Sequence, residues 1–170
     1  MKEIIYNYDN VNDNEINRIV RRAKVLIIND NNEIMFAHSN NNYFLIGGHV
    51  DTDESDYECL EREIKEEIGL DVKIDKINPF LKIKYLNRDY PSDGVNTLSI
   101  ASYYILKDNL IPNLDNVKLT KEEESGKFHV VNISLMDAIN TLVNSVDNST
   151  RANAVLDTIE AVKEYINISN

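Results

Sequence analysis

The stretch that most constrains the fold is residues 48–70, GHVDTDESDYECLEREIKEEIGL. Apolar side chains recur in it at intervals of three and four, the spacing of one face of an α-helix. These side chains are Tyr57, Leu60, Ile64 and Ile68. A helix over residues 55–68 buries this stripe. Because a glycine pair precedes it and Gly69 is typical of a left-handed helix end, we expect a rigid loop-helix-loop.

Three glutamates of the predicted helix, Glu63, Glu66 and Glu67, stand at i, i+3 and i+4. Their carboxylates therefore converge beside the apolar stripe, and each like-charge pair costs about 0.2–0.5 kcal/mol on an exposed helix. A divalent cation reverses this cost, because hard cations such as Mg²⁺ prefer carboxylate oxygen. The cluster predicts a metal site. The alternative is a solvated, charge-rich helix face, which the flanking glycines make less attractive.

Two further residues of this segment have predictable roles. Arg62 adjoins the acidic cluster and can reach back to Glu54, so we expect it to orient carboxylates through bidentate hydrogen bonds. The alternative is an ordinary surface ion pair. Cys59 falls on the polar side of the helical wheel, where we expect a structural or surface role rather than a reactive one.

The glycines, glutamates and arginine of residues 48–70 stand at positions that resemble the Nudix box without a mismatch. The resemblance implies an α/β/α sandwich with a mixed β-sheet. It also implies hydrolysis of a nucleoside diphosphate linked to another moiety, by water attack on phosphorus, with Mg²⁺ or Mn²⁺ as cofactor. By the same comparison, the Gly47 carbonyl completes the metal shell, Arg62 and Glu54 support the catalytic centre, and Glu63 or Glu66 is the general base.

Some family members instead draw the base or a metal ligand from a distal loop. The run of glutamates at residues 122–124, followed by Ser125 and Gly126, is the corresponding candidate, and we favour Glu123 as a metal ligand. The alternative is a solvated acidic loop.

Strands and helices alternate along the rest of the chain, which predicts a mixed sheet with helices on both sides. We expect strands at residues 23–29, 33–38, 43–46, 72–86, 97–106 and 127–132, and closing helices at 134–145 and 150–166. The whole chain, residues 1–170, is expected to form a single domain in which residues 1–20 and 147–170 are peripheral extensions.

The predicted substrate contacts lie mostly outside the acidic cluster. His49 follows the glycine pair, close enough to meet a phosphate, and Tyr85 lies in the region where family subtypes differ. Arg88 belongs to the turn-rich link 87–96, which is long enough to overhang a site. No subtype is assigned, because the proline marker of that region is missing. For the other two histidines, at positions 38 and 129, we expect structural roles with satisfied hydrogen bonds.

The amino-acid composition limits the kinds of molecule that this chain is expected to bind. The chain has 170 residues, a formal net charge of −11 and one cysteine. The acidic charge argues against duplex nucleic acid, and a single cysteine fits a reducing compartment. There is no apolar run of membrane-spanning length and no secretory signal in the first residues, so we expect a cytoplasmic protein that acts on a small molecule and does not bind membranes. A homodimer is plausible because symmetric pairs are the commonest oligomers.

Three other functions compete with hydrolysis. A Nudix-like module that binds a nucleotide or metabolite without turnover usually lacks box carboxylates, and this chain keeps them. A scaffold that binds a basic partner through its acidic surface does not require the box spacing. An isomerase of the same fold needs a cysteine to protonate its substrate, and the only cysteine, Cys59, lies inside the box helix.

Overall fold

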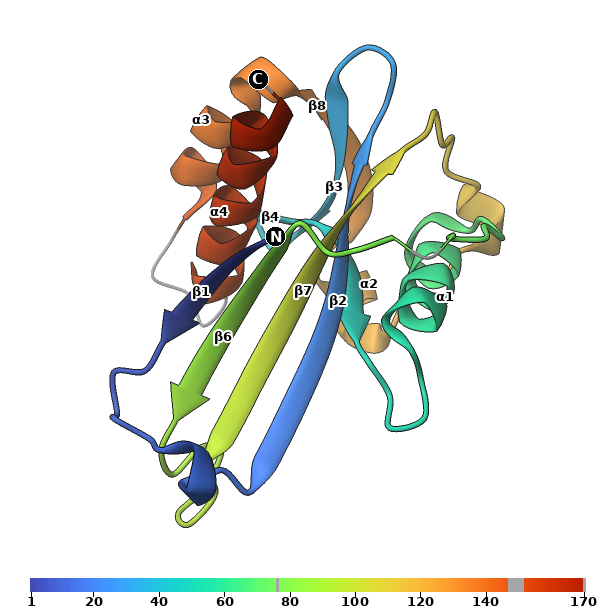
Figure 1. Ribbon diagram of the computed structural model, residues 1–170. Helices are drawn as coiled ribbons and strands as arrows, with labels where there is room; N and C mark the ends of the chain where they lie inside the picture. The colour runs from blue at the N-terminus through green and yellow to red at the C-terminus, as the bar shows by residue number, and fades with distance from the viewer. Residues whose placement is uncertain (76, 147–151, 170) are drawn as a thin grey trace.

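The computed structural model describes residues 1–75, 77–146 and 152–169, which form an eight-stranded mixed sheet with helices on both faces (Figure 1). The strands are β1 (Lys2–Tyr6), β2 (Arg18–Ile28), β3 (Glu33–Ser39), β4 (Asn42–Phe44), β5 (Ile46–His49), β6 (Leu81–Asn87), β7 (Thr97–Lys107) and β8 (His129–Ser134). The helices are α1 (Asp56–Ile68), α2 (Lys121–Ser125), α3 (Leu135–Ser145) and α4 (Ala152–Ser169), with short 3-10 turns at η1 (Asp13–Glu15) and η2 (Leu114–Asn116). The predicted α/β/α sandwich is confirmed.

Strand β2 lies at the centre of the sheet and divides it. Along its whole length it pairs in parallel with β7, whereas on its other side it pairs antiparallel with β5 at its middle and with β3 at its end. The full strand order is β1-β6-β7-β2-β3-β4, with β5 on β2 and β8 on β3. Two different strands, β5 and β3, therefore pair with the same edge of β2, and the sheet divides between them.

Each face of the sheet has its own apolar core, because neighbouring side chains of a strand point to opposite faces. In β2, Leu26 and Ile28 pack with α3 and α4, while Val25 and Ile27 pack with α1. The helix stripe predicted for α1 is confirmed, since Leu60, Ile64 and Ile68 are fully buried and Tyr57 packs beside them.

Helix α1 begins and ends where the sequence predicts. Ser55 is its N-cap and accepts a hydrogen bond from the Glu58 backbone N–H, and the Glu58 carboxylate accepts one from the Ser55 backbone N–H. At the other end, Gly69 has a φ of 73° and a ψ of 20°, the left-handed geometry of a helix C-cap.

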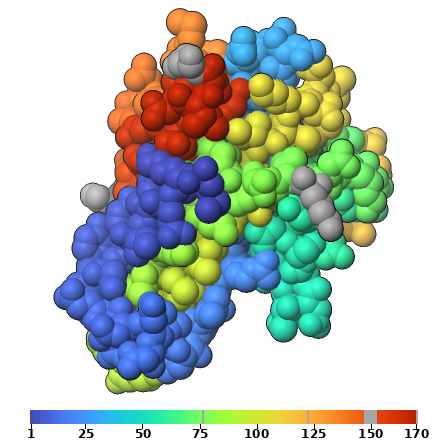
Figure 2. Space-filling model, in the orientation of Figure 1, coloured from blue at the N-terminus to red at the C-terminus, as the bar shows by residue number. Residues whose placement is uncertain are grey.

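The described parts of the predicted peripheral extensions, residues 1–20 and 152–169, contribute to the sheet and the core, while residues 147–151 and 170 lie outside the described residues. Strand β1 pairs in parallel with β6 at the sheet edge, and Val155, Ile159 and Val162 of α4 are in the core. Figure 2 shows the dark blue N-terminal residues beside the red C-terminal helix, and Lys2 forms an ion pair of 3.1 Å with Glu164. Strand β1 therefore extends the sheet, and α4 covers one of its faces.

The boundaries of the other elements differ in places from those expected. Strand β2 begins five residues before the predicted position, at Arg18, and the strand predicted from residue 72 begins only at Leu81. The glutamate run predicted as a loop lies within the short helix α2, and Ser134 is the N-cap of α3. None of the helices in the described ranges is long and apolar enough to cross a bilayer.

Candidate active site

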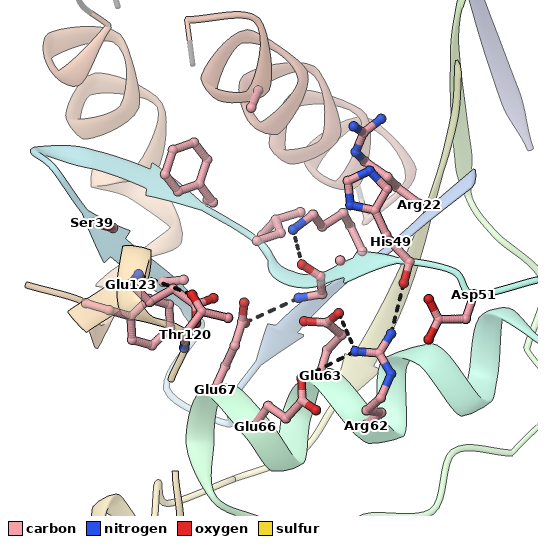
Figure 3. Close-up of a pocket in the computed structure, with 18 residues that line it drawn as sticks. Arg22, Ser39, His49, Asp51, Arg62, Glu63, Glu66, Glu67, Thr120 and Glu123 are labelled. Atoms are coloured by element: carbon pink, nitrogen blue, oxygen red, sulfur yellow. Dashed lines mark hydrogen bonds and ion pairs between the residues drawn. The ribbon is translucent and has the colours of Figure 1, made fainter. Parts of the chain in front are cut away.

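A cavity of about 560 Å³ opens between α1, β5, β3 and α2, where the sheet divides (Figure 3). Its size is in the usual range for small-molecule sites. Four glutamates face it from two separate parts of the chain, namely Glu63, Glu66, Glu67 and Glu123. Three basic side chains, Arg22, Lys24 and Arg62, and the imidazole of His49 line the same cavity. The pocket thus combines a carboxylate side with a cationic side.

Two glycines of β5 let the strand approach its neighbours closely enough to form this pocket. Gly47 has a φ of 124°, and a Cβ there would lie 2.2 Å from the Ala23 carbonyl oxygen. A Cβ on Gly48 would lie 2.1 Å from Oε1 of Glu63. Both contacts are far too short for a side chain, so the glycine pair holds β2, β5 and the α1 carboxylates in contact.

Arg62 organises the carboxylates of α1. Its Nε and Nη2 donate to the two carboxylate oxygens of Glu54 at 2.9 and 3.0 Å, the predicted bidentate pair. Nη1 donates to Glu63 at 2.7 Å and to Glu66 at 3.3 Å, and Nη2 also donates to the His49 carbonyl oxygen at 2.9 Å. The bonds to Glu54 and the other carboxylates raise the pKa of Arg62, so the guanidinium stays charged. It therefore fixes the loop, the strand end and the helix together.

Glu67 is the most buried of the four glutamates, with 7% of its surface exposed. One of its oxygens accepts a hydrogen bond of 3.3 Å from the Gly47 backbone N–H. Burial raises its pKa, and the charge of nearby Glu63 raises it further. Burial also raises the pKa of Glu63, against the effect of Arg62. Two desolvated carboxylates close together favour either protonation or a cation between them.

The donor set therefore fits a divalent cation. Carboxylate oxygens from Glu63, Glu66 and Glu67 face one cavity, and buried anions of this kind are compensated in proteins by pairing or metal coordination. Within the described part of the chain, no group of three His, Cys, Asp or Glu side chains is arranged so that it could hold a metal ion. The reason is visible in the contacts, since Arg62 holds Glu63 and Glu66 and Gly47 holds Glu67.

The distal glutamate reaches the pocket from the opposite side. Glu123 lies on α2 and lines the cavity, and its side chain accepts a hydrogen bond of 2.6 Å from the Thr120 backbone N–H. Its charge also raises the pKa of Glu67. The structure thus brings the predicted distal residue to the α1 cluster, across some sixty residues of sequence.

The Gly47 carbonyl, predicted to complete a metal shell, is engaged by a protein group. The ammonium of Lys24 donates to it from β2, where Lys24 and Gly47 are register partners. Lys24 and Arg22 were not predicted as site residues. Their signal is present in the sequence, because both are charged and alternate around the fully buried Ala23 in a central strand.

Two of the three predicted substrate contacts are absent from the residues that line this pocket. Tyr85 donates a hydrogen bond of 2.6 Å to Asp157 of α4 and stacks on Tyr6. Arg88 pairs with Glu15 of η1 at 2.8 Å and bonds the Asn10 carbonyl. Both side chains are committed to structural partners, so the pocket does not support their predicted role. His49 alone of the three lines it.

The remaining cysteine and histidine predictions are mixed. Cys59 is fully buried, not on a polar face, because β5 covers that side of α1 and the thiol lies 3.2 Å from the His49 carbonyl oxygen. Burial raises its pKa to about 12, which fits the expected unreactive role. His38 packs between Tyr43 and His129, with both centroid distances 4.6 Å, but its buried Nδ1 has no hydrogen-bond partner among the described residues.

Comparison with known proteins identifies the fold and the family. The sequence model of the NUDIX domain matches residues 18–144. The chain belongs to the Nudix family. The match includes the glycine pair, α1 and Glu123, so all four glutamates of the pocket lie within the family domain.

Solved Nudix structures share the architecture. The E. coli dihydroneopterin triphosphate pyrophosphohydrolase is 15% identical, with a TM-score of 0.59 over 88% of this chain and 96% of that one. The E. coli ORF135 protein is 14% identical, with a TM-score of 0.53 over 94% of this chain and 96% of that one. Identities this low show a common fold alone. A search of curated proteins found no match.

Proposed function

We propose that this Nudix protein is a divalent-metal-dependent hydrolase that cleaves the pyrophosphate bond of a nucleoside diphosphate linked to another moiety. Membership of the family is consistent with pyrophosphate hydrolysis in general. The observation that carries the finer proposal is the single cavity into which Glu63, Glu66, Glu67 and Glu123 all face, opposite Arg22 and His49. The carboxylates can bind a divalent cation, and the basic side chains can bind the phosphate groups of a substrate.

Glu63, Glu66 and Glu67 would hold Mg²⁺ or Mn²⁺, with Glu123 as a further ligand from α2. A bound cation of this kind neutralises phosphate charge and lowers the pKa of a water molecule. Arg62 contributes as a positioning residue, because its bonds to Glu54, Glu63 and Glu66 fix where the carboxylates point. Glu54 supports Arg62 from outside the cavity and has both oxygens occupied.

We assign acceptance of the proton of the attacking water to Glu63 or Glu66. Glu63 is 13% exposed and its Oε1 is held by Arg62 at 2.7 Å, whereas Glu66 is 41% exposed and held only at 3.3 Å. Glu66 is therefore the freer of the two. Partial desolvation and the charges of Arg22 and Lys24 lower the pKa of His49, whose imidazole can donate a hydrogen bond to a phosphate oxygen.

Apolar side chains give the substrate a second kind of contact. Phe44 and Phe128 line the cavity together with Leu45 and Ala154. Aromatic rings of this kind can pack against the flat surface of a base. We expect the phosphates to lie toward α1 and the organic part of the substrate toward the phenylalanines.

A substrate panel tests the proposal. Phosphate release is measured, with coupled phosphatase or pyrophosphatase, from nucleoside triphosphates, nucleotide sugars, ADP-ribose and dinucleoside polyphosphates, each with Mg²⁺, Mn²⁺ or chelator. We expect turnover of one group that chelator abolishes. Tight binding of a nucleotide without turnover would instead identify a binding module, and would contradict hydrolysis. The retained box carboxylates favour the hydrolase.

A further inference from the structure

We propose that the ammonium of Lys24 acts as a counter-cation in this pocket. It binds the Gly47 carbonyl oxygen and leaves that oxygen when a divalent cation binds there. Lys24 thereby sets the affinity of the site for divalent cations. The inference rests on the proposed metal dependence. It concerns a residue that lies outside the Nudix box and was not identified from the sequence.

The position of Lys24 makes it part of the cation site. It lies at the middle of β2 and is the register partner of Gly47, so its side chain starts beside the carbonyl that it binds. Only glycine fits at this position, because a Cβ on residue 47 would lie 2.2 Å from the Ala23 carbonyl oxygen. Its N–H is bound to Glu67. Gly47 therefore contacts the buried Glu67 carboxylate through its N–H and the Lys24 ammonium through its carbonyl oxygen.

The charges around Lys24 explain why a cation is needed at this point. Arg62 forms ion pairs with Glu54, Glu63 and Glu66, but no Lys or Arg of the described residues forms an ion pair with Glu67. Lys24 in turn pairs with no carboxylate in the described part of the chain and binds a neutral carbonyl instead. Its charge still acts on the pocket, since it lowers the pKa of both Glu67 and Glu63. It compensates these carboxylates across space.

A divalent cation on the α1 glutamates and an ammonium on the Gly47 carbonyl compete for the same oxygen. A lysine can yield, because its charge sits on a flexible four-carbon stem with three rotatable donors. At about 6 Å in water, repulsion between a single and a double positive charge corresponds to roughly a tenfold change in affinity. Removal of the ammonium should thus tighten cation binding by at least about tenfold.

The test is a titration of the full chain with Mn²⁺, followed by the electron paramagnetic resonance signal of free Mn²⁺, with no substrate present. Lys24→Met is expected to lower the Kd for Mn²⁺ at least about tenfold. Lys24→Arg, which keeps the charge and the donor, is expected to stay within about threefold of the wild type. Lys24→Gln keeps a donor without charge and carries the test if the methionine variant does not fold.

Arg22→Met is the matched control, because Arg22 is two residues away on the same strand, lines the same cavity and is equally charged. Its Mn²⁺ affinity is expected to change by less than about threefold, because the charge of Lys24 lowers the pKa of Glu63 and Glu67, whereas the charge of Arg22 acts on His49 and Asp157. Equal affinity in wild type and both neutral Lys24 variants, or equal tightening in Arg22→Met, would overturn the inference. The proposed function fails separately, if wild-type protein binds no Mn²⁺ or if Glu67→Gln binds it as well as wild type.

Discussion

Arg62→Ala is the substitution that tests the organisation of the pocket most broadly. It removes the bidentate pair with Glu54 and the bonds to Glu63, Glu66 and the His49 carbonyl. Loss of a partner from a fully buried ion pair costs about 3–5 kcal/mol, and an exposed pair is worth about 0–1 kcal/mol. Glu54 and Glu63 are 14% and 13% exposed, but Arg62 itself is 32% exposed. We therefore expect a loss of roughly 2–3 kcal/mol.

Thermal unfolding followed by circular dichroism measures this loss. For a domain of this size, roughly 2–3 kcal/mol corresponds to a fall in Tm of about 4–12 °C. Arg21→Ala is the control, since Arg21 makes one ion pair, with Asp56 at the start of the same helix, and is 44% exposed. That control is expected to cost less than about 1 kcal/mol. The reasoning is refuted if Arg62→Ala unfolds within 2 °C of wild type in chelator, or no earlier than Arg21→Ala.

Three further predictions concern other parts of the fold. Glu67→Gln is expected to keep the fold and to reduce turnover at least about a hundredfold, because it removes a cation ligand. Steady-state rates measure this loss, and wild-type activity in the variant would exclude Glu67 as a cation ligand. Gly48→Ala puts a Cβ 2.1 Å from Glu63 Oε1 and should lower kcat at least about tenfold by displacing that carboxylate, whereas an unchanged kcat would show that the close approach is dispensable. Burial raises the pKa of Asp157 from 3.8 to about 6, so the folded state keeps a proton that the unfolded state has lost, and stability falls as pH rises from about 4 to 6. Asp157→Asn, which can still accept from Tyr85, should remove this fall and add roughly 1–3 kcal/mol at pH 7.5 in urea titrations; an unchanged pH profile would count against it.

The box helix could be predicted from sequence because its determinants are local. The apolar spacing and Gly69 act within a few residues of one another, and each has the predicted geometry. The pairing of Arg62 with Glu54 was also accessible, because the two residues are only eight positions apart in the sequence.

The rest of the pocket depends on contacts between distant segments. Lys24 meets Gly47 only because β5 pairs with β2, and no local pattern fixes that register. Arg88 looked available for substrate, but Glu15, seventy-three residues earlier in the chain, occupies it. Cys59 looked polar on a helical wheel, which cannot include the strand that covers it. In each case, the environment of the side chain depends on tertiary packing, which sequence periodicity does not reveal.

The role of the ends was missed for a similar reason. Strand β1 and helix α4 carry no recognisable motif. In the folded chain, β1 pairs with β6, and α4 packs on the face of the sheet that also packs against α3. Their burial is a property of the assembled sheet. Short apolar patterns at the chain ends carry little information about which face they join.

The most direct test of the central claim is hydrolysis in ¹⁸O-labelled water of the best substrate from the panel, with ³¹P NMR of the products. Water attack on phosphorus predicts one ¹⁸O atom in a phosphorus-containing product, formed with Mg²⁺, absent with chelator, and reduced at least about a hundredfold in Glu67→Gln. The account is contradicted if no panel compound is hydrolysed, if the label is found outside the phosphoryl groups, or if chelator and Glu67→Gln leave the labelled product unchanged.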